Sequence, residues 1–393
     1  MGKKKQDRYT QRGVSSGKED VHAAIKRLDK GLYPKAFCKI FPSMRGEMYG
    51  SIMHADGAGT KAALAYAYWK QTGDLTVLHG LAQDSMVMNF DDLLCVGATG
   101  HMDVSSTLQR NKRLISAEAI QAIIEGTQIF IDDMNSYGYD MRNMGGETAD
   151  LGDLVRTLVL DHTFHTEMHR AEVINLANVR PGDVIVGLAS YGQASYEKNY
   201  NSGMGSNGLT SARHDIFGKY MAKRFPDTFD PKMKKSLRYC GKHTLLEVEP
   251  ETGRTFGQLV LSPTRTYGPI IKTLFESIPR SYIHGIIHCS GGGQTKCLHY
   301  IDKMHIVKDK MLPVPPLFRI IQKDTGTLPY EMYRTFNMGH RMEIYLPEEY
   351  AQKVVDIAKS FNVDAQVIGR CDPHDGRRLT IYSQEYGAKL KYC

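Results

Sequence analysis

An acid, two glycines and a lysine lie within six positions of the stretch MHADGAGTK, residues 53–61. These chemically interesting residues are Asp56, Gly57, Gly59, Thr60 and Lys61. A carboxylate binds a hard cation through oxygen, glycine lets backbone N–H groups approach oxyanions, and lysine adds positive charge. The combination suits a polyphosphate with its magnesium ion. A plain strand–turn–helix corner with a surface lysine explains the same stretch equally well.

Two further acid-rich segments follow this corner. In the expected helix 82–98, Asp84 and Asp91 lie about 20° apart around the axis, since each residue turns the helix by roughly 100°. Asp92 lies about 80° from Asp84. Carboxylates this close repel one another unless water or cations separate them, so the segment is either a metal site or an exposed face. The stretch MGGETAD, residues 144–150, again combines glycines with an acid, although a tight turn is its simpler explanation. Its candidate residues are Gly145, Gly146, Glu147 and Thr148.

Three glycines follow an expected strand in CSGGGQ, residues 289–294, and His288 precedes them. Such a run exposes successive backbone N–H donors, as a bound phosphate requires. Its spacing differs from that of a P-loop and from that of a dinucleotide-binding loop. The glycines are Gly291, Gly292 and Gly293. His288 is a candidate for proton transfer because histidine titrates near neutrality. The alternative is a hydrogen-bonded histidine at a strand end.

Strands and helices must interleave to position these motifs. Runs of β-branched residues predict strands, and apolar residues at helical spacing predict helices. The expected strands are 49–56, 155–167, 184–189, 282–288 and 341–347, and the expected helices are 60–73, 82–98, 116–134 and one that starts at 348. This alternation places the chain in the mixed α/β class. A Pro-Gly connector within 171–183 predicts a boundary near residue 175, and hence domains 1–175 and 176–393.

The overall composition excludes several classes of protein. A chain of 393 residues is too long for one ordinary core, and 41% hydrophobic with 24% charged residues is typical of a soluble globular protein. The apolar runs are far shorter than a bilayer span. Seven cysteines without a C-x-x-C pair argue for reduced thiols in the cytoplasm and against a zinc site or a disulfide framework. The net charge of +7 suits anionic small molecules, and the dispersed basic and aromatic residues do not suggest a nucleic-acid partner.

In their order along the chain, the motifs resemble those of the phosphoribosylformylglycinamidine cyclo-ligase family, also called aminoimidazole ribonucleotide synthetases. The matching segments are ADGAGTK, DLLCVGA, GGETAD, SNGLT (206–210), LSPTRTYG, HCSGGG and YEMYRTFNMG (330–339), preceded by YTQRGVSSGKEDVHAAIK (9–26). The resemblance spans nearly the whole chain. The acid–glycine motifs also occur in selenophosphate synthetase and thiamine-phosphate kinase, whereas SPTRTYG and MYRTFNMG are more specific to the cyclo-ligase.

The resemblance implies a two-domain α/β (α+β) fold in which the N-terminal sheets of two subunits pair into a dimer barrel. It implies a homodimeric, cytoplasmic ligase of purine biosynthesis. This enzyme converts ATP and formylglycinamidine ribonucleotide into aminoimidazole ribonucleotide, ADP and phosphate. The implied metal is Mg²⁺, with K⁺ as a further candidate. The implied partner is a phosphorylated small molecule, and neither nucleic acid nor a membrane is expected.

The same resemblance implies roles for individual residues. The implied magnesium ligands are Asp56, Asp84, Asp92 and Glu147. The implied nucleotide-binding residues are Gly57, Gly59, Thr60, Lys61, Gly145, Gly146, Thr148, Ser206, Asn207, Gly208, Arg265, Gly291, Gly292 and Gly293. Lys61 is expected to face the triphosphate. Lys26, which matches a lysine of the family's first helix, and His288 form the expected catalytic set.

Three segments depart from the family pattern. The segment YPKAFCKIFPSMRG stands where the family has a glycine-rich loop, and QTKCLH replaces an acid–Asn–Pro–Arg run after the three glycines. Gly205 stands where the family has a histidine before Ser-Asn-Gly, and it follows an insertion, residues 191–205. We interpret this insertion as a lid over the bound anion. The alternative is a surface excursion without function.

Three other functions compete with the cyclo-ligase. A selenophosphate synthetase needs a reactive cysteine near a glycine-rich loop, and the neighbours of Cys38, AFCKIFPS, lack those glycines. A non-catalytic nucleotide-binding homologue does not need clustered acids. A nucleic-acid binder finds no support in the motif pattern.

Overall fold

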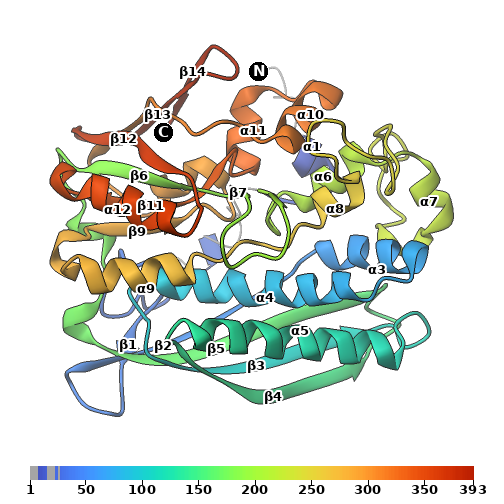
Figure 1. Cartoon of the computed structure of the whole chain (residues 1–393), viewed down its shortest axis with the longest axis horizontal. Helices are drawn as coiled ribbons and strands as arrows, with labels where there is room; N and C mark the ends of the chain where they lie inside the picture. Colours follow the sequence, from blue (N-terminus) through green and yellow to red (C-terminus); the bar gives the residue numbers. More distant parts are fainter. Residues whose placement is uncertain (1–7, 16–22, 25–26) are drawn as a thin grey trace.

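Two sheets lie one above the other with helix α4 (Thr76–Leu94) packed between them (Figure 1). The computed structural model describes residues 8–15, 23–24 and 27–393, so the expected catalytic residue Lys26 lies outside the described residues. Both sheets are mixed, because each contains one parallel pair among antiparallel ones. The two-domain α/β fold expected from the sequence is confirmed.

The first sheet has five strands in the order β1-β2-β5-β3-β4. These strands are β1 (Phe41–Pro42), β2 (Tyr49–Gly57), β3 (His101–Arg110), β4 (Asp140–Asp150) and β5 (Leu158–His169). The helices of this half are α3 (Lys61–Thr72), α4 and α5 (Ala117–Ser136). The strands expected at 49–56 and 155–167 and the helices expected at 60–73 and 116–134 are confirmed to within three residues.

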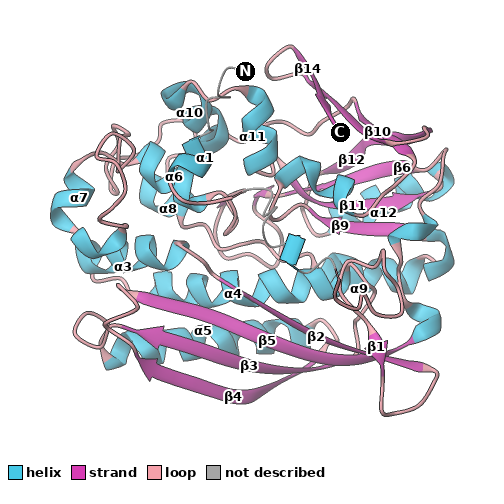
Figure 2. Cartoon of the chain, turned by 180° about the vertical axis from the view of Figure 1, so that it is seen from behind, coloured by secondary structure: helices cyan, strands magenta, loops and turns pink. Residues whose placement is uncertain are grey.

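One face of the first sheet is left uncovered. Along β5, buried and partly exposed residues alternate strictly, as expected for a strand with one face on the core. Met53 of β2 is 71% exposed although it lies in mid-strand. In Figure 2 this sheet forms the base of the molecule. Pairing of this sheet with that of a second subunit in a homodimer remains a prediction. The uncovered face is the surface that such pairing would use.

Helix α4 is buried on nearly all sides, because it packs against β2, β5, α5, α9 (Gly268–Ser277) and β9 (Gly285–His288). It begins earlier than the expected helix 82–98 and ends at Leu94. Its carboxylates Asp84 and Asp91 are fully buried and Asp92 is 7% exposed, so the alternative of an exposed acidic face is wrong. In the described part of the chain, no helix is both long and apolar enough to cross a membrane.

The second sheet has seven strands in the order β14-β13-β10-β12-β6-β11-β9. Besides β9, these are β6 (Val184–Ala189), β10 (Met304–Lys308), β11 (His340–Leu346), β12 (Ala365–Pro373), β13 (Arg377–Ser383) and β14 (Ala388–Tyr392). The remaining helices are α6 (Leu209–Ile216), α7 (Tyr220–Arg224), α8 (Phe256–Val260), α10 (Pro316–Thr325), α11 (Pro329–Thr335) and α12 (Glu348–Ser360). Every residue of β6 and β11 is buried; β6 is apolar throughout, whereas β11 also buries His340, Arg341 and Glu343.

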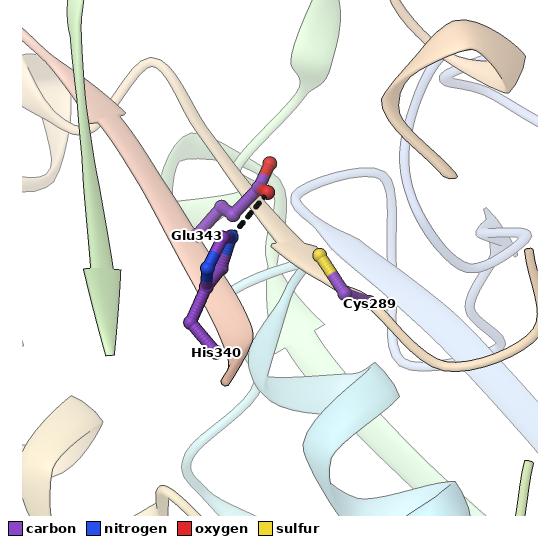
Figure 3. Close-up of side chains that lie close together, drawn as sticks. All are labelled: Cys289, His340 and Glu343. Atoms are coloured by element: carbon purple, nitrogen blue, oxygen red, sulfur yellow. Dashed lines mark hydrogen bonds and ion pairs between the residues drawn. The ribbon is translucent and has the colours of Figure 1, made fainter. Parts of the chain in front are cut away.

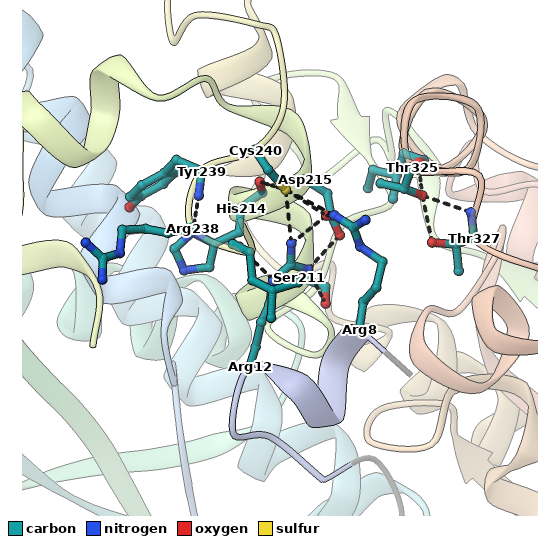
Figure 4. A network of polar contacts seen from close by, with 12 residues as sticks. Arg8, Arg12, Ser211, His214, Asp215, Arg238, Tyr239, Cys240, Thr325 and Thr327 are labelled. Atoms are coloured by element: carbon teal, nitrogen blue, oxygen red, sulfur yellow. Dashed lines mark hydrogen bonds and ion pairs between the residues drawn. The ribbon is translucent and has the colours of Figure 1, made fainter. Parts of the chain in front are cut away.

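The short N-terminal helix α1 (Arg8–Gln11) is attached to α6 through one carboxylate (Figure 4). The guanidinium groups of Arg8 and Arg12 each lie 2.6 Å from Oδ1 of Asp215. Arg12 also donates to the hydroxyl of Ser211 at 3.0 Å. The YTQRG segment is therefore held against α6, the helix that directly follows the Ser-Asn-Gly motif.

Candidate active site

Asp92, near the C-terminal end of α4, binds two imidazoles from different strands. Nδ1 of His288, at the end of β9, donates to Oδ1 of Asp92 at 2.7 Å. Nε2 of His54, on β2, lies 3.4 Å from Oδ2 of the same carboxylate. Nδ1 of His54 donates to the side-chain oxygen of Asn89 at 2.9 Å. The tertiary fold therefore brings together three segments that are far apart in the sequence.

Charge explains the protonation of this cluster. Burial by itself raises the pKa of Asp92, but the hydrogen bonds from His288 and His54 outweigh it and hold that pKa well below its usual range. Burial by itself lowers the pKa of His54, but Asp92 and, more weakly, Asn89 and Asp56 raise it to about 9. At neutral pH the cluster thus holds an ionised Asp92 and a protonated His54.

The sequence reasoning did not single out His54. The residue lies two positions before Asp56 on β2, and alternate residues of a strand point to the same face. That spacing is the signal from which His54 was predictable. Asp56 itself is exposed at the end of β2, where its carboxylate accepts the backbone N–H of Gly57 at 2.7 Å. Carboxylate oxygen at this position suits a magnesium ligand.

Steric requirements explain the two glycines of the strand–turn–helix corner at residues 53–61. A Cβ on Gly57 would overlap the Asp161 carboxylate and come within 2.6 Å of the Leu160 carbonyl oxygen. Gly59 has a φ of +57° with open space around it, so it supplies the turn into α3. Thr60 and Thr210 are joined through their hydroxyls at 2.8 Å, which links this corner to the SNGLT segment.

Lys61 and Asp84 lie elsewhere than the resemblance implies. Nζ of Lys61 donates to Oδ1 of Asp84 at 2.8 Å and to the Ser262 carbonyl at 2.5 Å, and both side chains are fully buried. Thr264 also donates to Oδ1 of Asp84, from its backbone N–H at 2.8 Å and its hydroxyl at 2.5 Å. Burial lowers the pKa of Lys61 and raises that of Asp84, and their mutual attraction opposes both effects. The two charges neutralise each other in the interior instead of facing a phosphate or a metal ion.

Glu147 is separated from Asp56 by the width of the first sheet. In the strand registers, Asp56 pairs with His162, His162 with Ser106, and Ser106 with Gly146, so β4 lies three strands from β2. At about 4.8 Å per strand, the separation is about 14 Å. Because magnesium binds oxygen at about 2 Å, one ion cannot bind both acids within this chain. Gly145, Gly146 and Thr148 share the exposed edge strand with Glu147.

The Ser-Asn-Gly turn and the three-glycine loop lie beside each other. The Asn207 side-chain nitrogen is 3.6 Å from the position that a Cβ on Gly291 would take. Gly292 and Gly293 have φ angles of +91° and +51°, and a Cβ on Gly293 would lie 2.5 Å from the Phe336 carbonyl oxygen. Gly208, with a φ of +77°, packs against the same phenylalanine. The segments SNGLT, HCSGGG and MYRTFNMG therefore form one surface.

Polar groups around this surface are buried and lack a hydrogen-bond partner among the described residues. They are the Ser206 hydroxyl, Nε2 of His288, and Nε and Nη1 of Arg341. Arg341 lies beside His288, because the residue that follows it, Met342, pairs with His288 in the sheet. A buried guanidinium with unused N–H groups is suited to bind an anion. Sequence reasoning missed Arg341, because it stands outside every motif.

Arg341 also accounts for one departure from the family pattern. A Cβ on Gly205 would lie 2.8 Å from Nη1 of Arg341. A histidine at position 205 would therefore require the end of the Arg341 side chain to move. In this chain the arginine occupies the space beside the Ser-Asn-Gly turn and supplies hydrogen-bond donors there.

Arg265 is fully buried and holds the insertion. Its guanidinium forms a two-point ion pair with Glu197, at 3.0 Å from Nε to Oε1 and 2.5 Å from Nη2 to Oε2. It also donates to the carbonyls of Ala189 and Tyr191. The structure thus gives Arg265 intramolecular partners, and the nucleotide-binding role that the resemblance implies remains a prediction. Asn201 of the insertion donates to the Pro263 carbonyl at 2.8 Å.

The insertion forms a small hairpin of β7 (Tyr191–Gly192) and β8 (Asn201–Ser202) whose ends are anchored. The Tyr196 hydroxyl donates to the Thr266 carbonyl at 2.8 Å. Lys198 is exposed at the tip. Lid motion remains a prediction, and the contacts of Tyr196 and Glu197 anchor the middle of the insertion beside Lys198.

One buried group has the residue types of a metal site (Figure 3). Its carboxylate, however, is already neutralised by a lysine. Ligand atoms of Cys289, His340 and Glu343 lie within 4.8 Å of one another. The ammonium of Lys308 already forms an ion pair with Glu343, whose other oxygen accepts the Tyr345 hydroxyl at 2.7 Å. Burial raises the pKa of the Cys289 thiol well above its usual range.

The lysine of this group also positions the glycine loop. Lys308 donates to the backbone carbonyl and the side-chain oxygen of Gln294 at 2.9 and 3.0 Å. Gln294 in turn donates to the carbonyls of Asn337 and His340. We therefore describe the group as the buried support of the three glycines, and it explains how QTKCLH is accommodated.

Two family descriptions match the chain. Residues 38–164 match "AIR synthase related protein, N-terminal domain", and residues 180–381 match "AIR synthase related protein, C-terminal domain". Three similar proteins are named phosphoribosylformylglycinamidine cyclo-ligase. The protein of Methanocaldococcus jannaschii is 30% identical over 82% of this chain and 78% of its own length. Those of Methanococcus maripaludis and Methanococcus vannielii are 27% and 26% identical, over 98% and 87% of this chain and 92% and 85% of their own.

Solved structures share the fold at low sequence identity. Phosphoribosylformylglycinamidine synthase II from Thermotoga maritima is 12% identical, with a TM-score of 0.54 over 98% of this chain and 49% of that one. Thiamine monophosphate kinase from Aquifex aeolicus is 13% identical, with a TM-score of 0.52 over 91% of this chain and 93% of that one. At these identities the similarity establishes the architecture alone.

Proposed function

Because the chain belongs to the family of AIR synthase related proteins, we propose that it closes the imidazole ring of formylglycinamidine ribonucleotide in an ATP-dependent reaction. The products are aminoimidazole ribonucleotide, ADP and phosphate. The observation that carries the proposal is the ionised Asp92 bound to His288, beside the unpartnered buried donors of Ser206 and Arg341. The name of the relatives that align over nearly the whole chain supports the same reaction.

The chemistry requires activation of a poor leaving group. The formamide oxygen of the substrate first accepts the γ-phosphoryl group of ATP, and ADP leaves. The ribose-linked nitrogen then attacks the activated carbon, loses a proton and expels phosphate, which closes the five-membered ring. Phosphoryl transfer depends mainly on positioning and on neutralisation of negative charge.

The described residues divide this work among them. Arg341 and Ser206 would bind phosphoryl oxygens together with the backbone N–H groups of Gly291 and Gly292, since that of Gly293 donates to the Ser290 carbonyl. His288, held by Asp92 through Nδ1, has Nε2 left to accept or return the proton of the attacking nitrogen. Asp92 has the role of orienting this imidazole.

Carboxylate oxygens of Asp56 and Asp92 would bind magnesium; at Asp92 the ion would take the place of His54 on Oδ2, while Oδ1 keeps His288. Without the ion, the protonated His54 interacts with both acids, since Asp92 and, more weakly, Asp56 raise its pKa. Bound Mg²⁺ would supply charge neutralisation at the transferred phosphoryl group. Glu147 would belong to a second ion, across the sheet.

The rival selenophosphate synthetase loses support from the surroundings of Cys38. This thiol is buried and its pKa is raised well above the usual range by burial and by the charge of Asp92. A reactive cysteine needs the opposite conditions.

We further propose that the protein works as a homodimer through its open sheet face, in a cytoplasm that keeps the seven cysteines reduced. Light scattering tests the dimer.

The activity is tested by ADP release from purified protein. ADP should form only when formylglycinamidine ribonucleotide is present, together with a diazotisable aminoimidazole. Asp92→Asn should lower turnover by about two orders of magnitude or more, since the imidazole loses its orientation. Substituting a carboxylate remote from the cluster, as in Asp132→Asn, is the control and should leave turnover unchanged. Efficient ADP formation with selenide or thiamine phosphate would refute the proposal.

A further inference from the structure

A separate cavity of about 200 Å³ lies between the insertion, α8 and the turn that joins α3 to α4. Its polar and aromatic lining includes Tyr68, Asp74, Tyr200, Arg254 and Gln258. None of its lining residues belongs to the cluster of His54, Asp92 and His288. The insertion contributes Asn199 and Tyr200 to the wall, so this cavity depends on the segment that distinguishes the chain from its family's pattern.

The cavity lining contains one positively charged side chain, Arg254, and one negatively charged side chain, Asp74. Arg254, just before α8, has a guanidinium with no hydrogen bond or ion pair to any residue that the structure describes. Asp74, in the α3–α4 turn, is fixed by accepting from the backbone and hydroxyl of Thr76 at 2.9 and 2.6 Å. The rings of Tyr68 and Tyr200 also line the space. A complementary ligand has a flat ring, an anionic group for Arg254 and N–H donors for Asp74.

We propose that this cavity binds a purine mononucleotide of the adenosine monophosphate class. The phosphate binds the guanidinium of Arg254, since arginine binds phosphate at two points. The base lies against Tyr68 and Tyr200, since aromatic side chains pack against flat rings. Its exocyclic amino group faces Asp74. At about 200 Å³ the cavity is smaller than the roughly 300 Å³ at which ligand sites usually begin, so part of the nucleotide would lie outside it.

The cavity wall is connected to the buried pair of the interior. The Ser262 carbonyl, in the wall, accepts the ammonium of Lys61, and Thr264 donates to Asp84. The wall residue Pro263 accepts the side chain of Asn201 from the insertion. A ligand that contacts this wall therefore contacts the segment that fixes both the pair and the insertion. This makes the cavity suited to a regulatory nucleotide, whatever reaction the chain catalyses.

The proposal is tested by equilibrium dialysis of the full chain in EDTA, so that sites requiring Mg²⁺ are excluded. The probes are AMP and its two halves, adenosine and ribose 5-phosphate. AMP should bind at one site per chain, and each half should bind at least about tenfold more weakly, because ring and phosphate contribute separately. The only tryptophan, Trp69, follows Tyr68 and provides a fluorescence signal for the same titration.

Variants assign the binding to the cavity. Arg254→Ala should weaken AMP at least about tenfold and leave adenosine unchanged, because it removes only the phosphate partner. Tyr200→Leu should weaken both AMP and adenosine. The matched control Arg45→Ala, in the loop between β1 and β2, and Asp92→Asn should both leave AMP binding unchanged. Absence of saturable AMP binding, insensitivity to Arg254→Ala, or loss of binding in Asp92→Asn would each overturn the proposal.

Discussion

The substitution Lys61→Met distinguishes a structural role of this lysine from the phosphate-binding role that the family implies. It leaves the carboxylate of Asp84 fully buried, with Thr264 as its remaining donor and Oδ2 without a partner among the described residues. Breaking a buried ion pair in this way costs about 3–5 kcal/mol. Lys61→Met should therefore lower the free energy of unfolding by about that amount, a large share of a typical domain's stability.

The assay is urea unfolding at neutral pH for a double-mutant cycle. Lys61→Met/Asp84→Asn should recover most of the loss, because a neutral amide still accepts from Thr264 and no unpaired charge is buried. The matched control is Lys112→Met, which removes an exposed lysine 3.4 Å from Asp150 and should change stability little, since solvent screens that pair.

The opposite pattern of results would refute the structural assignment. If Lys61→Met unfolds like the parent protein but raises the KM for ATP strongly, then the lysine faces the triphosphate as the family resemblance implies. A double variant no more stable than Lys61→Met alone would likewise refute the energetic coupling of the buried pair.

Three further predictions follow from the described contacts. Arg341→Lys should raise the KM for the phosphorylated substrates about tenfold and leave the free energy of unfolding unchanged, because an ammonium lacks the planar set of donors of a guanidinium. Steady-state kinetics checks this, and an unchanged KM would contradict it. Burial lowers the pKa of His162 to about 4, so the unfolded chain takes up a proton at this residue before the folded chain does. The free energy of unfolding is therefore at its full value above about pH 6.5 and falls by about 3 kcal/mol as the pH drops towards 4. Unfolding curves of His162→Gln should lack that part of the pH dependence, and an identical pH profile would contradict the prediction. Glu197→Gln should expose the insertion to proteolysis, because Arg265 loses its counter-ion and a buried charge is left unpaired; unchanged protease resistance would argue against an anchored insertion.

The sequence by itself determined the elements and the family. The strand at 49–56 and the helix at 60–73 were predictable because their side-chain patterns report local burial, and β2 and α3 follow them closely. The order of the glycine and acid motifs determined the two-domain fold, because turns and close backbone approaches demand glycine at fixed places. Gly57, against Leu160, and Gly293, against Phe336, are such places.

The tertiary structure alone decided what each charged side chain does. Asp84 and Asp92 share a helix and looked alike in the sequence, yet one pairs with Lys61 in the interior and the other binds His288, 196 positions away. Arg265 lies within a motif and is used up by Glu197, whereas Arg341 lies outside every motif and keeps unused donors. The physical reason is that burial makes a charge depend on whichever opposite charge the fold places within about 3 Å, and that neighbour comes from a distant segment.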